Sequence, residues 1–164
     1  MKTNTIVFSL LVAALNFSLA GETEAFKAPN GGRLVKSVTP TAEFVVNKEK
    51  KIEIRFLEGG KIVAPAQQIV TVTMGDRAAP TKLTFTADGD KLVSDKAIPK
   101  GDNLPVVLQI KSNADAKAVN EKFNLNLGNC PTCSNHEYAC ACDHSAGGEK
   151  HKHHDSEGHE GHDH

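Results

Sequence analysis

The sequence predicts an all-β protein, an immunoglobulin-like antiparallel β-sandwich followed by a disordered tail rich in cysteine and histidine. Three observations lead to this prediction. Short runs of alternating apolar and polar residues recur at regular spacing between about residues 27 and 128, with turn residues between them. Roughly seven to nine such strands fit a sandwich better than a barrel or an α/β fold. After Gly128 the chain becomes too polar to bury a core.

The N-terminus has the three parts of a secretory signal peptide. Lys2 precedes an apolar run over residues 6–15, and Ser18 and Ala20 place small side chains at the −3 and −1 positions of a cleavage site. A membrane anchor needs about 18 or more apolar residues, and Asn16 interrupts the run first. We therefore expect a signal peptide over 1–20, cleavage after Ala20, a periplasmic or secreted protein, and no membrane span in the mature chain.

Residues 21–32 are expected to form a polar leader that ends in a tight turn at 30–32, and residues 33–128 to form the sandwich. A charged turn separates the runs 41–47 and 51–57, in which Ile52, Ile54 and Phe56 alternate with polar residues; this pattern predicts a hairpin. A short strand over 61–63 ends before Pro65, because proline cannot donate to a β-ladder.

The second half of the domain shows the same pattern. Strands are expected over 69–74, 82–86 and 91–94, and Asp88-Gly89 between the last two is a strong hairpin signal. Two further strands are expected. The first directs Val106, Leu108 and Ile110 inward, and the second directs Phe123, Leu125 and Leu127 inward. Residues 112–120 fit either a loop or one helical turn. The apolar positions suffice for a core, so the domain should not need the cysteines.

Composition argues against several function classes. The formal net charge is −1 and no basic cluster occurs, so a nucleic-acid partner is not expected. The domain contains no histidine and no glycine-rich phosphate loop, which leaves no recognisable catalytic constellation. We therefore do not expect an enzyme.

All four cysteines and all eight histidines lie between Cys130 and His164. Residues 129–144 carry the spacing Cys130-x2-Cys133-x6-Cys140-x-Cys142, with His136 and His144 interleaved. Two close pairs separated by a short loop can bring four sulfurs onto one tetrahedral ion, and a histidine can replace a sulfur. The pairs lie closer together than in a zinc ribbon, so the sequence predicts a compact metal-binding segment of another kind.

Two alternatives for the cysteines stay open at this stage. Export would expose them to oxidation, and crossed disulfides between the two pairs are then as plausible as metal ligation. Cys130-Pro131-Thr132-Cys133 also resembles the dithiol of glutaredoxin-like proteins. That family places the first cysteine at the start of a helix, and no helical pattern follows here, so redox chemistry is the weakest of the three interpretations.

The tail, residues 145–164, adds further imidazole and carboxylate donors on a backbone expected to be disordered. Imidazole binds zinc, copper, nickel and cobalt, so we expect zinc first, with copper and nickel close behind. Only Met74 would remain after signal removal, which argues against a methionine-lined copper site. The histidines of this tail that we expect to act as metal ligands are His151, His153, His154, His159, His162 and His164.

The segment Ala28-Pro29-Asn30-Gly31-Gly32-Arg33-Leu34 resembles the P-H-G-G-R/K start of small periplasmic proteins and adaptor subunits associated with heavy-metal efflux. The resemblance covers this start and the metal-rich terminus. It implies a role in metal homeostasis and an efflux or metal-acceptor protein as partner. Asn30 stands where those proteins commonly carry histidine, so no ligand is expected there.

The sequence therefore predicts an exported transition-metal-binding protein, a buffer, sensor or carrier, in which a β-sandwich displays a Cys/His-rich terminus. The alternative from another class is a protein-interaction module that binds a partner through a sheet face or edge and uses the terminus as a spacer.

Overall fold

The computed structural model describes residues 27–142. The expected signal peptide and the expected disordered tail therefore lie outside the described residues. Within them the chain forms strands and one short 3-10 helix, which confirms the all-β prediction. The elements are β1 Arg33–Val35, β2 Thr41–Val46, β3 Ile52–Glu58, β4 Lys61–Val63, β5 Ile69–Met74, β6 Thr81–Asp88, β7 Lys91–Ser94, β8 Leu104–Lys111, β9 Val119–Leu125 and η1 Glu137–Ala139.

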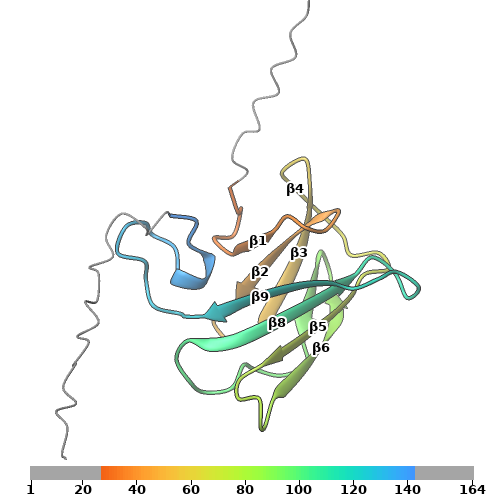
Figure 1. Cartoon of the computed structure of the whole chain (residues 1–164). Helices are drawn as coiled ribbons and strands as arrows, with labels where there is room; N and C mark the ends of the chain where they lie inside the picture. The colour runs from red at the N-terminus through yellow and green to blue at the C-terminus, as the bar shows by residue number, and fades with distance from the viewer. Residues whose placement is uncertain (1–26, 143–164) are drawn as a thin grey trace, which may run out of the picture.

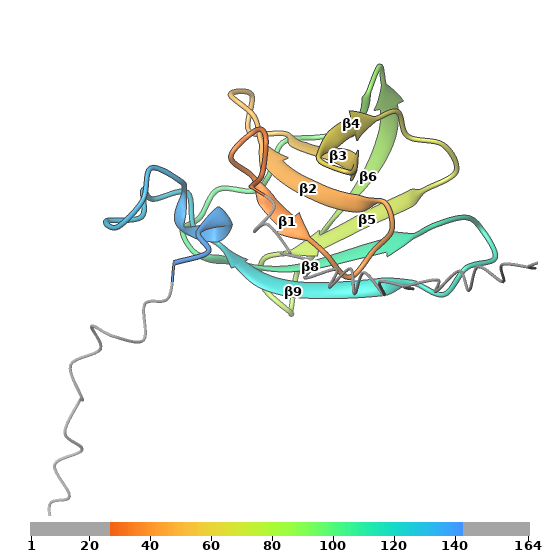
Figure 2. The same cartoon turned by 90° about the horizontal axis from the view of Figure 1, so that it is seen from above.

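The strands form two antiparallel layers that share one strand (Figures 1 and 2). The first layer has the order β1-β2-β3-β7, with β4 also pairing with β3, and the second has the order β5-β8-β9. Strand β6 pairs with β5 through residues 81–84 and with β7 through residues 85–88, so it joins the layers. Strands β2, β3 and β7 correspond to strands A, B and E of an immunoglobulin domain, and β5, β8 and β9 correspond to strands C, F and G. The strand order is therefore that of an immunoglobulin-like sandwich.

The core lies between the layers and consists of the side chains that the period-two pattern directs inward. Ile52, Ile54 and Phe56 of β3 are each at most 1% exposed, and β2 pairs with β3 in the expected hairpin. Val106, Leu108 and Leu125 are buried as well. Residues 112–118 form a loop, so the helical alternative for that connection is wrong.

The core also includes two residues beyond the end expected for the sandwich. Tyr138 is 3% exposed and Ala139 is 9% exposed, and both belong to the same apolar cluster as the strands. We expected residues 33–128 to supply the whole core, but Tyr138 and Ala139 also contribute to it. The cysteine-containing segment, drawn in blue in Figure 1, packs against the end of the sandwich near β1 and β9.

Side chains bridge the gap between the two outer strands, β1 and β9. The guanidinium of Arg33 lies 4.7 Å from the ring centroid of Phe123. Just beyond β1, the hydroxyl of Ser37 donates a 2.9 Å hydrogen bond to the carboxylate of Glu121. These contacts bring the residues that precede β1 close to the residues that follow β9, and both of those segments contribute to the site described next.

Candidate metal centre

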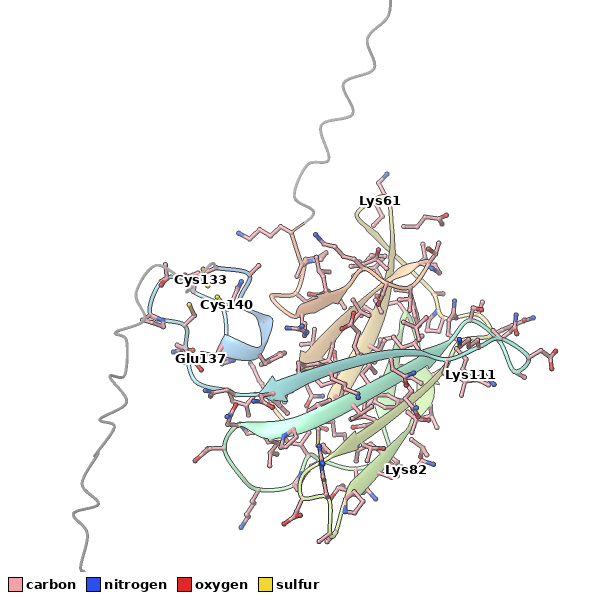
Figure 3. All side chains as sticks on the ribbon, in the orientation of Figure 1. Lys61, Lys82, Lys111, Cys133, Glu137 and Cys140 are labelled. Carbon is pink, nitrogen blue, oxygen red and sulfur yellow. The ribbon has the colours of Figure 1, made fainter. Side chains whose placement is uncertain are left out.

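The four cysteines converge on one point. The Sγ atoms of Cys130, Cys133, Cys140 and Cys142 all lie within 4.8 Å of one another. Cys140 Sγ lies 3.3 Å from Cys130 Sγ and 3.6 Å from Cys133 Sγ. Figure 3 shows Cys133 and Cys140 within the loop at the end of the sandwich. Both separations are longer than the S–S bond of a disulfide, which is about 2.05 Å.

The spacing of these sulfurs suits a tetrahedral metal ion. Four sulfurs at about 2.3 Å from a central zinc are separated from one another by about 3.8 Å. The measured contacts of 3.3 and 3.6 Å are close to that value. Small outward movements of the side chains would therefore accommodate an ion. Four protein sulfurs would fill its coordination sphere and leave no position for a substrate, as in structural rather than catalytic zinc sites.

Backbone hydrogen bonds fold the loop so that the two cysteine pairs meet. The amide of Cys130 donates to the carbonyl of Asn135 at 2.9 Å, and Asn129 forms an isolated antiparallel bridge with His136. The short helix η1 follows, and the amide of Cys140 donates to the carbonyl of Glu137 at 3.1 Å. The first pair therefore starts a tight loop and the second pair closes it.

Two backbone amides also point at sulfur. The amide of Thr132 donates to Cys130 Sγ at 3.4 Å, and the amide of Cys142 donates to Cys140 Sγ at 3.2 Å. Such bonds favour a negatively charged sulfur, and outer hydrogen bonds of this kind orient the ligands of metal sites.

The cluster distributes its protons unevenly. Burial raises the pKa of the Cys130 thiol, but hydrogen bonds from the Thr132 amide and the Cys140 thiol outweigh burial and lower this pKa to about 6. Hydrogen bonds to Cys140 and Cys133 raise the pKa of Cys142 to about 12. Of these two thiols, Cys130 therefore loses its proton more readily and Cys142 holds its proton more tightly. A bound cation would replace the remaining protons.

His136 was expected to act as a ligand, but the structure does not bring it into the four-sulfur group. Its side chain is exposed, and its ring stacks on Tyr138 with centroids 6.0 Å apart and an interplanar angle of 17°. The other predicted ligands, His144, His151, His153, His154, His159, His162 and His164, lie outside the described residues.

Tyr138 attaches the cysteine loop to the sandwich. Its ring packs edge-on against Phe44 at 5.9 Å between centroids, and its hydroxyl oxygen accepts the amide hydrogen of Val46 at 3.2 Å. Its own amide donates to the carbonyl of Asn126, and its carbonyl accepts a 3.3 Å hydrogen bond from Arg33. Burial raises the pKa of this phenol. Tyr138 was not among the predicted functional residues, although it is the sole tyrosine of the chain and lies within a polar segment.

Glu43 is a second structural residue of this region that the sequence pattern did not indicate. Strand alternation directs its side chain away from the core, yet it is 0% exposed because the leader turn covers it. Its carboxylate accepts hydrogen bonds from the amide and side-chain nitrogens of Asn30, both at 2.8 Å, and from the amide of Gly32 at 3.0 Å. A β-carbon at Gly32 would lie 2.4 Å from the carbonyl oxygen of Phe44, so this position requires glycine. The turn that carries the resemblance to efflux-associated proteins is thus fixed beside the cysteine loop.

No family model, no curated protein and no solved structure matches this chain. Among residues 27–142, no helix has the length and apolar character needed to cross a membrane.

Proposed function

We propose that this protein is an exported transition-metal-binding protein that holds a thiophilic ion between its four cysteines. The observation that carries the proposal is the convergence of four sulfurs within 4.8 Å at the end of a rigid sandwich. Cysteines that served only as small apolar residues would have no reason to gather in one group with their sulfurs in mutual contact.

The donor set favours particular ions. Four thiolates in a tetrahedral arrangement suit zinc, and thiolates also select copper in its singly charged state. Nickel and doubly charged copper are better suited to the imidazoles of residues 144–164. Met74 is 1% exposed within the sandwich core, so it offers no thioether for a copper site. Zinc is therefore the first candidate for the four-sulfur centre, and copper follows.

A closed four-sulfur centre is suited to storage or transfer, because it offers no open position for a substrate. We propose that the histidines of the tail collect ions at lower affinity and that the four-sulfur centre retains them. An efflux or metal-acceptor protein would then receive the ion, as the resemblance of residues 28–34 implies. The protein would act as a buffer, sensor or carrier and not as an enzyme.

The burial of Cys130 weighs against the redox alternative. Cys130 has the lowered pKa that a nucleophilic thiol needs, but it is only 4% exposed, whereas reactive cysteines are partly accessible. No helix follows Cys133 within the described part of the chain other than the single turn η1. A low thiol pKa at a buried sulfur surrounded by three others fits cation binding better than disulfide exchange.

The test is a metal titration of the chain from Gly21 and of two full-length variants. One variant replaces all four cysteines with serine, and the other replaces the seven histidines of residues 144–164 with glutamine. Cobalt serves as the probe, because sulfur ligation produces a charge-transfer absorption that nitrogen and oxygen ligation do not, and zinc should then displace it. We expect one cobalt per chain with this absorption in the parent and the histidine variant, and none in the cysteine variant.

Loss of the absorption in the histidine variant, or its absence from the parent, would contradict the four-sulfur centre. Uptake that is equal in the parent and the cysteine variant would favour the interaction-module alternative or a site confined to the tail. Native mass spectrometry of the protein from its own compartment then identifies the ion that it carries.

A further inference from the structure

A groove of about 510 Å³ opens beside the four-sulfur group, between the leader turn and the cysteine loop. Cys140 and Ala141 lie on one side of it, and Lys27, Arg33 and Lys36 lie on the other. We call it the cationic groove. Its volume is within the range of sites that take small molecules, about 300–1,000 Å³.

The charged side chains that line this groove carry the same sign. Among residues 27–142, its lining includes three cationic side chains, those of Lys27, Arg33 and Lys36, and no acidic one. Two carboxylates of the described residues lie nearby: that of Glu43 is fully buried and accepts hydrogen bonds from Asn30 and Gly32, and that of Glu137 accepts a hydrogen bond from the side chain of Asn126. A groove lined by one sign of charge raises the local concentration of ions of the opposite sign. A free metal cation would be repelled from these walls, whereas an anion would be attracted to them.

The groove also gives access to the metal centre. Cys140 is partly exposed and lines the groove, and its sulfur contacts both Cys130 and Cys133. Cys130 is buried. Cys140 is the one of the four cysteines that lines the groove, so an ion that arrives through the groove would reach the four-sulfur group at Cys140, and the other three sulfurs lie within 4.8 Å of that sulfur.

We propose that the cationic groove loads the metal centre, and that it receives the ion as a small, negatively charged carboxylate chelate. This inference depends on the proposed function. In the exchange, each bond between the metal and a carboxylate oxygen is replaced by a bond to a cysteine sulfur. Each thiol that becomes a ligand releases its proton to water or to the departing chelate, and no atom changes its oxidation state.

The experiment compares the rate of metal uptake from an anionic and from a cationic source. Cobalt citrate, which carries one net negative charge, is mixed with the chain from Gly21 without oxygen, and the sulfur-to-cobalt absorption is followed in time. The hydrated cobalt ion is the cationic source. The test variant is K27Q/K36Q, and Arg33 is retained because it also binds the carbonyl of Tyr138. The matched control is K61Q/K82Q, which removes two exposed lysines that Figure 3 shows far from the cysteine loop.

We expect K27Q/K36Q to take cobalt from citrate about threefold to tenfold more slowly than the parent at low ionic strength. Uptake of the hydrated ion should be unchanged or faster, and the control variant should match the parent. In about 1 M salt, where the screening length is about 3 Å, the difference should vanish. The equilibrium affinity for cobalt should be the same in all three proteins, because no ligand has changed.

An equal rate from citrate in the parent and K27Q/K36Q would overturn the groove proposal, as would equal slowing in the control. A variant that slows uptake of the citrate complex and of the hydrated ion alike would also overturn it. In each of these cases the parent still binds cobalt, so the proposed function stands. A parent that binds no cobalt would refute the proposed function and the groove together. If the double variant folds poorly, K36Q alone should show part of the same effect.

Discussion

The sandwich and the cysteine loop are ordered by different forces. In the sandwich, strands alternate and bury a continuous apolar core, so removal of apolar surface from water stabilises the fold. The loop from Cys130 to Cys142 has one turn of 3-10 helix and few apolar residues. Hydrogen bonds, sulfur contacts and Tyr138 hold it in place. The comparison indicates that burial of apolar surface orders the first region, whereas polar contacts and the packing of Tyr138 order the second.

The substitution with the largest expected effect should weaken zinc binding by the loop and leave the stability of the sandwich nearly unchanged. C140S removes the sulfur that contacts Cys130 and Cys133. We expect zinc affinity to fall by at least about a hundredfold, because even the loss of an outer partner of a metal site costs 10- to 100-fold. The stability of the metal-free protein in urea should change by only about 0.5 kcal/mol. Competition with a chelating dye measures the first quantity, and circular dichroism measures the second.

A substitution in the core of the sandwich provides the control, because it should lower stability and leave zinc affinity nearly unchanged. Leu108 is 1% exposed in β8, and Leu108→Ala should destabilise the sandwich by about 2–5 kcal/mol. Its zinc affinity at low temperature, where the variant is folded, should stay close to that of the parent. If C140S unfolds the sandwich, or Leu108→Ala abolishes zinc binding, the two regions are not independent in the way described.

Tyr138 is the residue through which each region should affect the other. Tyr138→Ala leaves a cavity against Phe44 and should cost about 3 kcal/mol or more in urea unfolding, since truncating a buried aromatic side chain costs about 3–5 kcal/mol. It should also weaken zinc binding, because the loop loses its attachment. Tyr138→Phe keeps the ring and loses only the hydrogen bond from Val46, which is worth about 1 kcal/mol.

A weaker zinc affinity in Tyr138→Ala with normal affinity in Tyr138→Phe would support the attachment. Parental affinity in both variants would show that the loop binds its ion without the sandwich. The full-length chain is used for each measurement, because a chain that ends at Gly128 would lack Tyr138 and Ala139 of the core.

The sequence was sufficient for the sandwich because strand periodicity is a local signal. The alternation in β3 and β8 identified the inward side chains, and the Asp88-Gly89 turn located the hairpin of β6 and β7. The ligand spacing likewise identified the four cysteines. Local pattern could not reveal Tyr138 or Glu43, because each is buried by a segment distant in sequence. It also could not show that His136 stacks on Tyr138 and does not join the sulfurs.

A smaller effect is expected from the carboxylate that holds the leader turn. Glu43→Gln keeps the shape but replaces one acceptor oxygen with an amino group, so either the backbone amides of Asn30 and Gly32, which share Oε1, or the side-chain nitrogen of Asn30 at Oε2 loses its acceptor. Such an unsatisfied buried group costs about 1–3 kcal/mol. Urea unfolding measures this loss, and hydrogen exchange of the Gly32 amide should accelerate. Glu58→Gln, at an exposed position, should have little effect; equal losses in both variants would contradict the role given to Glu43.

The smallest expected effect concerns acid stability of the sandwich alone. Burial raises the pKa of Glu53, but hydrogen bonds from Lys91, Asn47 and Arg55 outweigh it and hold this pKa below 4.5. A carboxyl with a lowered folded-state pKa stabilises the protein above its unfolded pKa, and that stabilisation is lost as the pH falls through the folded pKa. Stability should therefore decrease below about pH 4.5. Unfolding of the parent and Glu53→Gln across this range checks the assignment, since the variant should show a shallower decrease.

Because of its position, the fluorescence of Tyr138 can report metal binding without an added label. The chain has one tyrosine and no tryptophan, so ultraviolet-excited emission characteristic of tyrosine comes from a single ring. That ring lies at the junction between the cysteine loop and the sandwich, in contact with Phe44 and His136. Doubly charged copper, whose partly filled d shell quenches excited states, will reduce this emission at short range, whereas zinc, whose d shell is filled, will not. One unlabelled sample can thus distinguish the two metals and report whether the loop is seated.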